Sequence, residues 1–172
     1  MEIHVVRHTA VEGMEGVCYG QSDVGLAKDY MASFTQIETD PLYDRVISSP
    51  LTRCTQLADY LQLPYENDSR LMEVNFGNWE LKKWDDITRE EFDLWHQDYI
   101  NTPPPNGESL ACMQERVLEV LTELKNQHPM GKVLLITHAG VIRIIVSHIM
   151  GIPLSDMFTI KVGFGEIMKM QY

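Results

Sequence analysis

The sequence predicts an α/β fold, a three-layer α/β/α sandwich in which a mainly parallel sheet lies between two layers of helices. Strand-like apolar segments alternate with helix-like segments along the 172 residues, an order typical of parallel sheets with helices on both faces. Residues 133–136, Val-Leu-Leu-Ile, form a continuous apolar run, as expected for a central strand covered on both sides. The length fits a single domain over residues 1–172, with a small helical insertion expected at about residues 84–128.

The first quarter of the chain predicts two strands separated by irregular structure. Residues 2–7 form a short apolar segment that ends where Arg-His-Thr begins, and they predict the first strand. Residues 10–25 are rich in glycine and show no periodicity, which indicates a loop. A weak helix is expected at 26–38, and a second strand at 43–48.

Two helix starts are indicated by capping residues. Ser49 before Pro50 places a capping side chain ahead of a proline at the first helical position, and this predicts a helix over 51–61. Thr88, followed three residues later by Glu91, forms a capping box at the start of another helix. Between these helices, residues 69–74 indicate a short strand or an extended segment.

The second half of the chain predicts a long amphipathic helix and the central strand. Residues 101–107 contain three consecutive prolines and are expected to form a connection. The helix after them has an apolar face made by Leu110, Met113, Val117, Val120, Leu121 and Leu124. A further helix is expected at 141–150 after the central strand, with terminal strands at 158–162 and 166–172, the latter at an edge of the sheet.

The charge excludes some classes of partner. The sequence holds 14 basic and 25 acidic residues, a net charge of −11, which argues against nucleic-acid binding and against a polybasic membrane surface. Ten of the acidic residues lie between positions 85 and 123. A small anionic ligand responds mainly to charges within ~8 Å at physiological salt, so the net charge does not exclude a small anion. The three cysteines form no CxxC pair, and we expect a protein of the reducing cytoplasm.

Polar residues follow the predicted strands at equivalent places. His8 comes directly after the first strand and His138 directly after the central strand, while Arg53 lies in the first turn of the helix after the second strand. In open α/β sheets ligands bind at the carboxyl ends of the strands, so these side chains and Arg7 are expected to meet in one cleft. The backbone N–H groups of residues 139–140 would begin a helix there and favour an anion. Each residue alone is more readily explained as structural, but together they predict a phosphate pocket.

Five motifs resemble the histidine phosphatase superfamily, also called phosphoglycerate mutase-like. They occur in the family's order along nearly the whole chain: Arg7-His8-Thr9, Ser48-Ser49-Pro50-Leu51-Thr52-Arg53, Leu71-Met72-Glu73 with Phe76-Gly77-Asn78-Trp79-Glu80, Gly107-Glu108-Ser109, and Thr137-His138-Ala139-Gly140. One departure is Leu81, which stands where the family usually has glycine after the last Glu of its Phe-Gly-x-Trp-Glu motif.

The resemblance implies catalysis through a phosphohistidine. His8 would be the nucleophile, and Glu73 the general acid. Arg7, Arg53 and His138 would hold the oxygens of the transferring phosphoryl group. Substrate would also meet two residues beside this group, Tyr19 and Ala139. No metal or cofactor is implied.

Within the family, the loop 18–24 together with Arg7-His8-Thr9 is similar to the α-ribazole phosphatases, which implies α-ribazole 5′-phosphate, a cobalamin precursor, as the substrate. A broad-specificity small-molecule phosphatase is the first alternative. A phosphoglycerate mutase is less favoured, since Thr-Ala-Val at 9–11 replaces the Gly-Glu-Ser of cofactor-dependent mutases. A phosphohistidine-protein phosphatase and an inactive phosphate-binding module are the remaining alternatives. The oligomeric state is not predicted.

Overall fold

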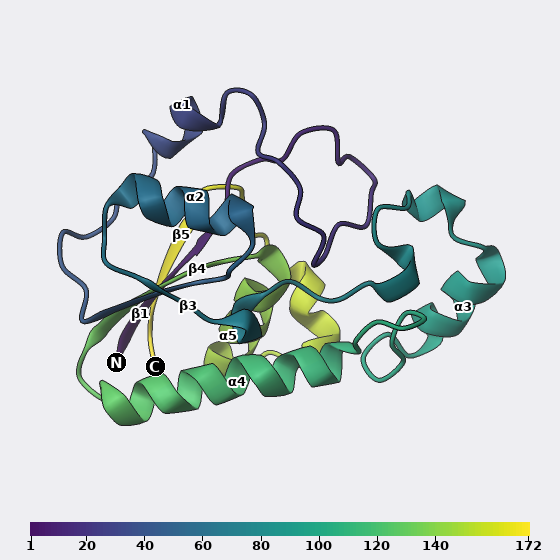
Figure 1. Ribbon diagram of the computed structural model, residues 1–172. Helices are drawn as coiled ribbons and strands as arrows, with labels where there is room; N and C mark the ends of the chain where they lie inside the picture. The colour runs from purple at the N-terminus through teal and green to yellow at the C-terminus, as the bar shows by residue number, and fades with distance from the viewer.

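A computed structural model describes all 172 residues and shows a five-stranded sheet with helices on both faces (Figure 1). The strands are β1 (Glu2–Arg7), β2 (Arg45–Ser48), β3 (Glu66–Asn67), β4 (Lys132–Thr137) and β5 (Ile167–Gln171). Their order in the sheet is β3-β2-β4-β1-β5. Only β5 runs antiparallel to its neighbour, β1, and the other pairs are parallel. The predicted three-layer fold with a mainly parallel sheet is therefore confirmed.

Two hydrophobic cores separate the sheet from its helical layers. The helices are α1 (Tyr30–Phe34), α2 (Thr52–Leu61), α3 (Arg89–Gln97), α4 (Leu110–Gln127) and α5 (Ala139–Met150). Helices α4 and α5 contribute to the larger core, and α1 and α2 to the smaller core on the opposite face. Successive residues of β4 alternate between them: Val133 and Leu135 face the larger core, and Leu134 and Ile136 the smaller. The alternation is the period of two of a strand, and it explains why this segment is apolar throughout.

Helix α3 stands away from the sheet, at one end of the molecule (Figure 1). It packs on a third, small core made of Cys18, Trp79 and Ile87. Helix α4, by contrast, covers the sheet, and its predicted apolar face is buried. The division into a domain with an insertion at about 84–128 stays a prediction, and the structure places the second half of that segment in the main core.

The two predicted helix caps have different outcomes. Thr88 accepts a hydrogen bond from the Glu91 N–H (3.3 Å) at the start of α3, as predicted. The prediction of Ser49 as the cap of α2 was wrong, because the helix begins at Thr52 after an extended Leu51 that caps nothing. The Thr52 N–H instead donates to Asp23 (2.9 Å), a residue distant in sequence.

Short elements account for the other differences from the prediction. Residues 158–162 do not form a strand: the first two belong to a 3₁₀ turn, η4 (Leu154–Thr159), and the remaining three are irregular. The segment 69–74 begins with another 3₁₀ turn, η1 (Ser69–Leu71), rather than a strand. The weak helix expected at 26–38 is reduced to α1. Strand β3 was not predicted, since its two residues are exposed and polar.

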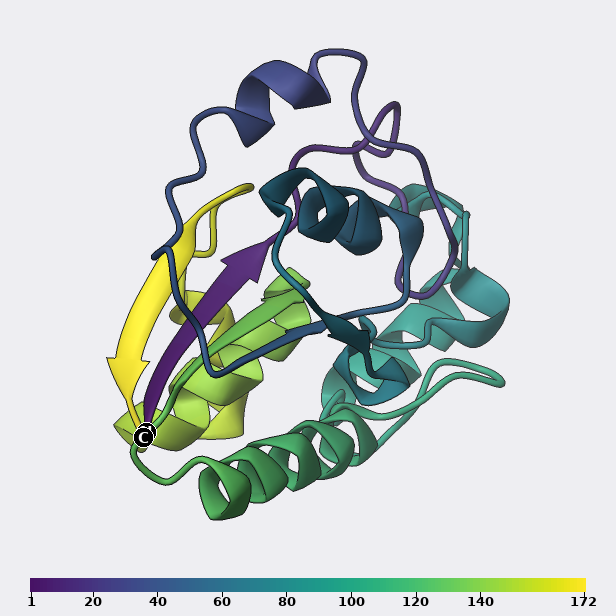
Figure 2. The ribbon, with the colours of Figure 1, turned by 60° about the vertical axis from the view of Figure 1, so that its left-hand side comes forward.

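The register of the sheet brings the ends of the parallel strands together. Arg7, the last residue of β1, pairs with Thr137, the last of β4, and Ser48 of β2 pairs with Ile136. Figure 2 shows these strands side by side, with β5 along the outer edge of β1. The residues that follow β1, β2 and β4 therefore meet at one edge of the sheet. None of the helices combines the length and the apolar character that a membrane-spanning helix requires.

Candidate active site

A cavity of about 270 Å³ opens at the carboxyl ends of β1, β2 and β4. This volume is close to the lower limit of small-molecule sites, ~300 Å³. The structure brings six of the seven predicted site residues to its lining: Arg7, His8, Tyr19, Arg53, Glu73 and His138. The seventh, Ala139, is buried in the larger core and is not among the lining residues.

His8 is presented with one ring nitrogen free to react. Its Nδ1 lies 2.7 Å from the carbonyl oxygen of Thr9, and because a carbonyl only accepts, Nδ1 carries the proton and Nε2 keeps its lone pair. The side chain is 2% exposed. Burial, together with the neighbouring charges of Arg53 and Arg7, lowers the pKa of His8 to about 3. His8 is therefore neutral at physiological pH, as a nucleophile must be.

Arg53 is fully buried and held on three sides. Its Nη2 donates to the carbonyl of Gly20 (2.6 Å), its Nη1 to the carbonyl of Ser22 (2.8 Å), and its Nε to His138 Nδ1 (3.3 Å). Burial lowers the pKa of Arg53, but a guanidinium remains charged at any physiological pH. Two of its five N–H donors are left for a ligand, and its plane is set by backbone carbonyls.

His138 lies beside His8 and between Arg53 and Ser49. The two imidazole rings have centroids 5.2 Å apart. Because the guanidinium can only donate, Nδ1 of His138 accepts from Arg53, and Nε2 lies 2.7 Å from the Ser49 hydroxyl. Burial and the neighbouring His8 and Arg53 lower the pKa of His138 well below its ordinary value. In this arrangement the most direct effect of His138 is to orient Arg53.

Arg7 supplies a second guanidinium at the cavity. Its Nη1 donates to the carbonyl of Val162 (2.9 Å), and its guanidinium lies over the ring of Phe164, 3.6 Å from the centroid. Its Nε is buried without a hydrogen-bond partner in the protein. A buried donor of this kind carries a large desolvation penalty, which an anionic ligand would offset.

Glu73 is fixed by two backbone N–H groups. Its Oε1 accepts from Val74 (3.0 Å), and its Oε2 accepts from Gly140 (3.0 Å) at the start of α5. The N–H of Gly140 was expected to bind an anionic ligand, but it holds the glutamate instead. The start of helix α5 thus positions the carboxyl group of the predicted general acid.

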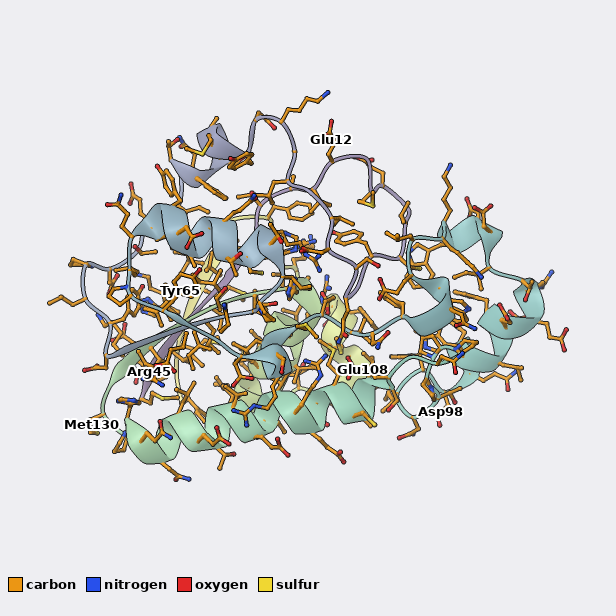
Figure 3. All side chains as sticks on the ribbon, in the orientation of Figure 1. Glu12, Arg45, Tyr65, Asp98, Glu108 and Met130 are labelled. Atoms are coloured by element: carbon orange, nitrogen blue, oxygen red, sulfur yellow. The ribbon has the colours of Figure 1, made fainter.

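The backbone around Glu73 is held by Arg116, a residue that the sequence did not single out. Its guanidinium donates to the carbonyl oxygens of Arg70 (2.6 Å), Met72 (2.8 Å) and Glu73 (3.1 Å). Glu108 binds the same guanidinium through both carboxylate oxygens, at 3.0 and 2.5 Å. Figure 3 labels Glu108 at the start of α4, on the side of the molecule that faces Asp98 and α3. Glu108 itself lines the cavity.

Arg143 is a third arginine at the cavity that was not predicted. Its Nε donates to the carbonyl of Ile160 (3.1 Å), and its guanidinium lies 5.7 Å from the ring centroid of Phe158. Burial lowers the pKa of Arg143. The sequence spacing could have indicated that Arg143 lies at the cavity, because it follows Gly140 by three residues and residues three apart share one face of a helix.

Aromatic side chains form the wall of the cavity away from the histidines. The lining includes Phe76, Trp84, Trp95, Tyr99 and Phe158. Trp95 contacts both Trp84 and Tyr99, with ring centroids 6.1 and 5.9 Å apart, and Tyr99 contacts Phe158 at 5.7 Å. Trp95 of α3 and Tyr99, which follows that helix, therefore pack against other aromatic rings and also line the cavity. The cavity therefore has two parts: a basic floor, made by Arg7, His8, Arg53 and His138, and this aromatic wall.

One group of potential metal ligands lies close together in the structure, and it is outside this cavity. Glu2, His4 and Asp40 bring potential ligand atoms within 4.8 Å of one another at the opposite end of β1. Asp40 is already paired with Lys132 (2.5 Å) and Lys169 (2.8 Å). These two ammonium groups lower the pKa of Asp40 to about 2. The cluster is therefore explained as a set of ion pairs.

Comparison with known proteins identifies the family. The family model of the histidine phosphatase superfamily (branch 1) matches residues 3–172. The chain belongs to the histidine phosphatase superfamily and is a phosphatase, as the motifs implied.

Individual relatives are distant. The chain is 24% identical over 176 residues to the adenosylcobalamin/alpha-ribazole phosphatase of Escherichia coli (strain K12), an alignment that covers 96% of this chain and 87% of the relative. It is 29% identical to human 6-phosphofructo-2-kinase/fructose-2,6-bisphosphatase 3, covering 98% of this chain but 33% of that protein. The crystal structure of the alpha-ribazole phosphatase from Shigella flexneri superposes with a TM-score of 0.88 at 23% identity, covering 98% of this chain and 89% of the other. That similarity supports the phosphoglycerate mutase-like fold.

Proposed function

We propose that the protein hydrolyses a phosphate monoester whose alcohol part carries an aromatic group, most specifically α-ribazole 5′-phosphate, through a phosphohistidine intermediate. The observation that carries this proposal is that one and the same cavity is lined by the basic residues around His8 and by the aromatic side chains of Trp84, Trp95, Tyr99 and Phe158. α-Ribazole 5′-phosphate has both matching parts, a phosphate and a flat benzimidazole that would stack on aromatic rings. The similarity to the E. coli phosphatase supports the same choice.

The chemistry proceeds in two transfers. In the first, Nε2 of His8 attacks phosphorus while the bond to the ester oxygen breaks, and Glu73 gives its proton to that oxygen. In the second, a water molecule attacks the phosphohistidine, its proton passes to Glu73, and the N–P bond breaks. His8 and Glu73 then return to their starting forms. The free donors of Arg7 and Arg53 stabilise the charge on the phosphoryl oxygens in both steps.

The identity of the leaving group is tested by a pair of substrates. We expect kcat/KM for α-ribazole 5′-phosphate to exceed that for ribose 5-phosphate, which has the same phosphate but no aromatic group. Trp95→Leu should reduce the first value by about tenfold, the effect of one lost stacking contact, and leave the second nearly unchanged. Equal kcat/KM values for both substrates and for a panel of nucleotides and phosphoglycerates would instead indicate a broad-specificity phosphatase.

The covalent step is tested separately. Enzyme that is mixed with a ³²P-labelled monoester and then quenched in alkaline detergent should carry label that is stable to alkali and labile to acid, as expected for phosphohistidine. His8→Ala should abolish both the label and the turnover. Hydrolysis that survives this substitution undiminished would reject the mechanism.

We also propose that the protein acts in the cytoplasm on a small phosphate ester. All three cysteines, Cys18, Cys54 and Cys112, are free in the structure. Burial raises the pKa of Cys18 and of Cys54 to about 12, so neither is a reactive thiolate. Unpaired cysteines are typical of proteins in a reducing compartment.

A further inference from the structure

Glu80 is a carboxylate that the chemistry above does not use; it does not line the cavity itself but binds the backbone of Phe76, which does. It accepts four hydrogen bonds: Oε1 from the N–H groups of Gln21 (2.9 Å) and Phe76 (3.0 Å), and Oε2 from the N–H (3.0 Å) and hydroxyl (2.5 Å) of Ser22. Three of the four come from the loop at 20–22, which has no helix or strand to satisfy its backbone. Glu80 therefore replaces the regular hydrogen bonds that this loop lacks.

The same loop holds Arg53. The carbonyl oxygens of Gly20 and Ser22 accept from the two terminal nitrogens of its guanidinium, at 2.6 and 2.8 Å. Within Ser22, the N–H is bound by Glu80 and the carbonyl is bound by Arg53. Ser22 therefore connects the carboxylate of Glu80 directly to the guanidinium of Arg53. The loop is also pressed close to the carboxylate, because a Cβ added to Gly20 would lie 2.8 Å from Glu80 Oε1.

The turn after Glu80 fixes the carboxylate relative to the loop. Leu81 has φ = +64°, a left-handed conformation that is unfavourable for a branched side chain. Its N–H donates to the carbonyl of Cys18 (2.6 Å), and the N–H of Cys18 donates to the carbonyl of Lys82 (2.9 Å). These paired segments place Glu80 opposite the loop. The replacement of the family's usual glycine by Leu81 therefore leaves the left-handed turn in place.

We propose that Glu80 is a positioning residue for phosphoryl transfer, which orients Arg53 through the carbonyls of Gly20 and Ser22. The proposal rests on the proposed function, in which Arg53 binds the phosphoryl oxygens. Arg53 contacts only the transferring group in that mechanism, so loss of Glu80 should weaken phosphate binding and slow all phosphomonoesters by the same factor. Loss of the general acid would instead slow different phosphomonoesters by different factors, which depend on the leaving group.

Inorganic phosphate is the probe, and isothermal titration calorimetry measures its dissociation constant. We expect Glu80→Ala to weaken phosphate binding by about tenfold, the effect of a misdirected charge-assisted hydrogen bond. Glu80→Gln should weaken it less, because one oxygen still accepts from the loop. Glu90→Ala removes an exposed carboxylate on α3 and should change nothing. Both Glu80 variants should lower kcat/KM for p-nitrophenyl phosphate and for an alkyl phosphate equally.

A double-mutant cycle separates positioning from a general structural effect. Because Arg53→Lys removes the paired contacts with Gly20 and Ser22, Glu80→Gln should have almost no further effect on phosphate binding in that background. Additive effects, or Glu80 variants that fold and bind phosphate like the wild type, would overturn the positioning role. If Arg53→Lys alone leaves phosphate binding unchanged, the proposed phosphate pocket fails as well, and the two failures are thereby distinguished. Glu80→Gln is the decisive variant if Glu80→Ala does not fold.

Discussion

Glycine at position 140 is the residue whose replacement tests the placement of Glu73 most directly. An added Cβ at Gly140 would overlap Oε1 of Glu73 and lie 3.1 Å from its carboxyl carbon and 3.2 Å from Met113 Cε. The Gly140 N–H also donates to Oε2 of the same carboxylate (3.0 Å). Gly140→Ala therefore has to displace the glutamate, since the α5 backbone is fixed by helical hydrogen bonds and buried packing.

The size of the effect follows from this displacement. Relief of the overlap moves the carboxylate by about 1 Å, and a misplacement of that size costs about 10²-fold in rate. General acid catalysis contributes about 10² to 10⁴-fold to the rate. A displaced Glu73 slows only the step in which the leaving group needs a proton. We expect kcat/KM for an alkyl phosphate to fall about 100-fold. For p-nitrophenyl phosphate, whose leaving group scarcely needs protonation, the fall should be less than about tenfold.

Steady-state kinetics with the two substrates, together with urea unfolding, make the measurement. Gly25→Ala is the matched control, because a Cβ there meets no atom within 4 Å. In a helix without the clash, glycine to alanine would stabilise the fold by about 1 kcal/mol. A Gly140→Ala enzyme that is more stable by that amount and fully active toward both substrates would refute the reasoning.

Three further predictions concern His8, Glu73 and Leu81. The pKa of His8 is about 3 in the folded protein against 6.5 unfolded, so the unfolded chain binds more protons between these values and the free energy of unfolding falls as the pH drops. Between pH 7 and pH 5 this residue should lower the free energy of unfolding by about 2 kcal/mol. In urea unfolding, His8→Asn should remove this pH-dependent loss, whereas the exposed control His96→Gln should retain it. Equal pH dependence in both variants would contradict the buried, neutral state of His8. Glu73→Gln should slow an alkyl phosphate far more than p-nitrophenyl phosphate, and equal losses would exclude the glutamate as general acid. Leu81→Gly should raise the unfolding free energy by about 0.5–1 kcal/mol through relief of the left-handed strain, with unchanged phosphate binding, and a clear loss of stability would show that the exposed leucine is needed for packing.

Local patterns were sufficient for the elements that contribute most to the core. The apolar segment of β4 and the apolar face of α4 are buried as predicted, because burial of a strand or a helix face requires that periodicity whatever the partner. Strand β3 lacks such a signal. Its two exposed residues pair with β2 only because the sheet already offers an edge, so no pattern within the segment indicates it.

Ser49 shows how a correct local rule can give a wrong result. Serine before proline is a sound start signal for a helix, but the Ser49 hydroxyl lies 2.7 Å from His138 Nε2 and α2 begins later. Asp23, remote in sequence, accepts from the first N–H of the helix in its place. Such exchanges of partner between distant segments cannot be read from either segment alone.

The sequence by itself determined the α/β class, the family and the set of residues at the strand ends, because strand and helix periodicity and the motif order are properties of the chain. Only the tertiary structure decided how those residues are held. Arg116 and Glu108 hold the backbone of Glu73, and Gly140 binds its carboxylate. The aromatic wall was likewise decided by packing, since it brings α3 against segments distant in the chain. These contacts depend on distance and direction in space, which residue type and spacing do not specify.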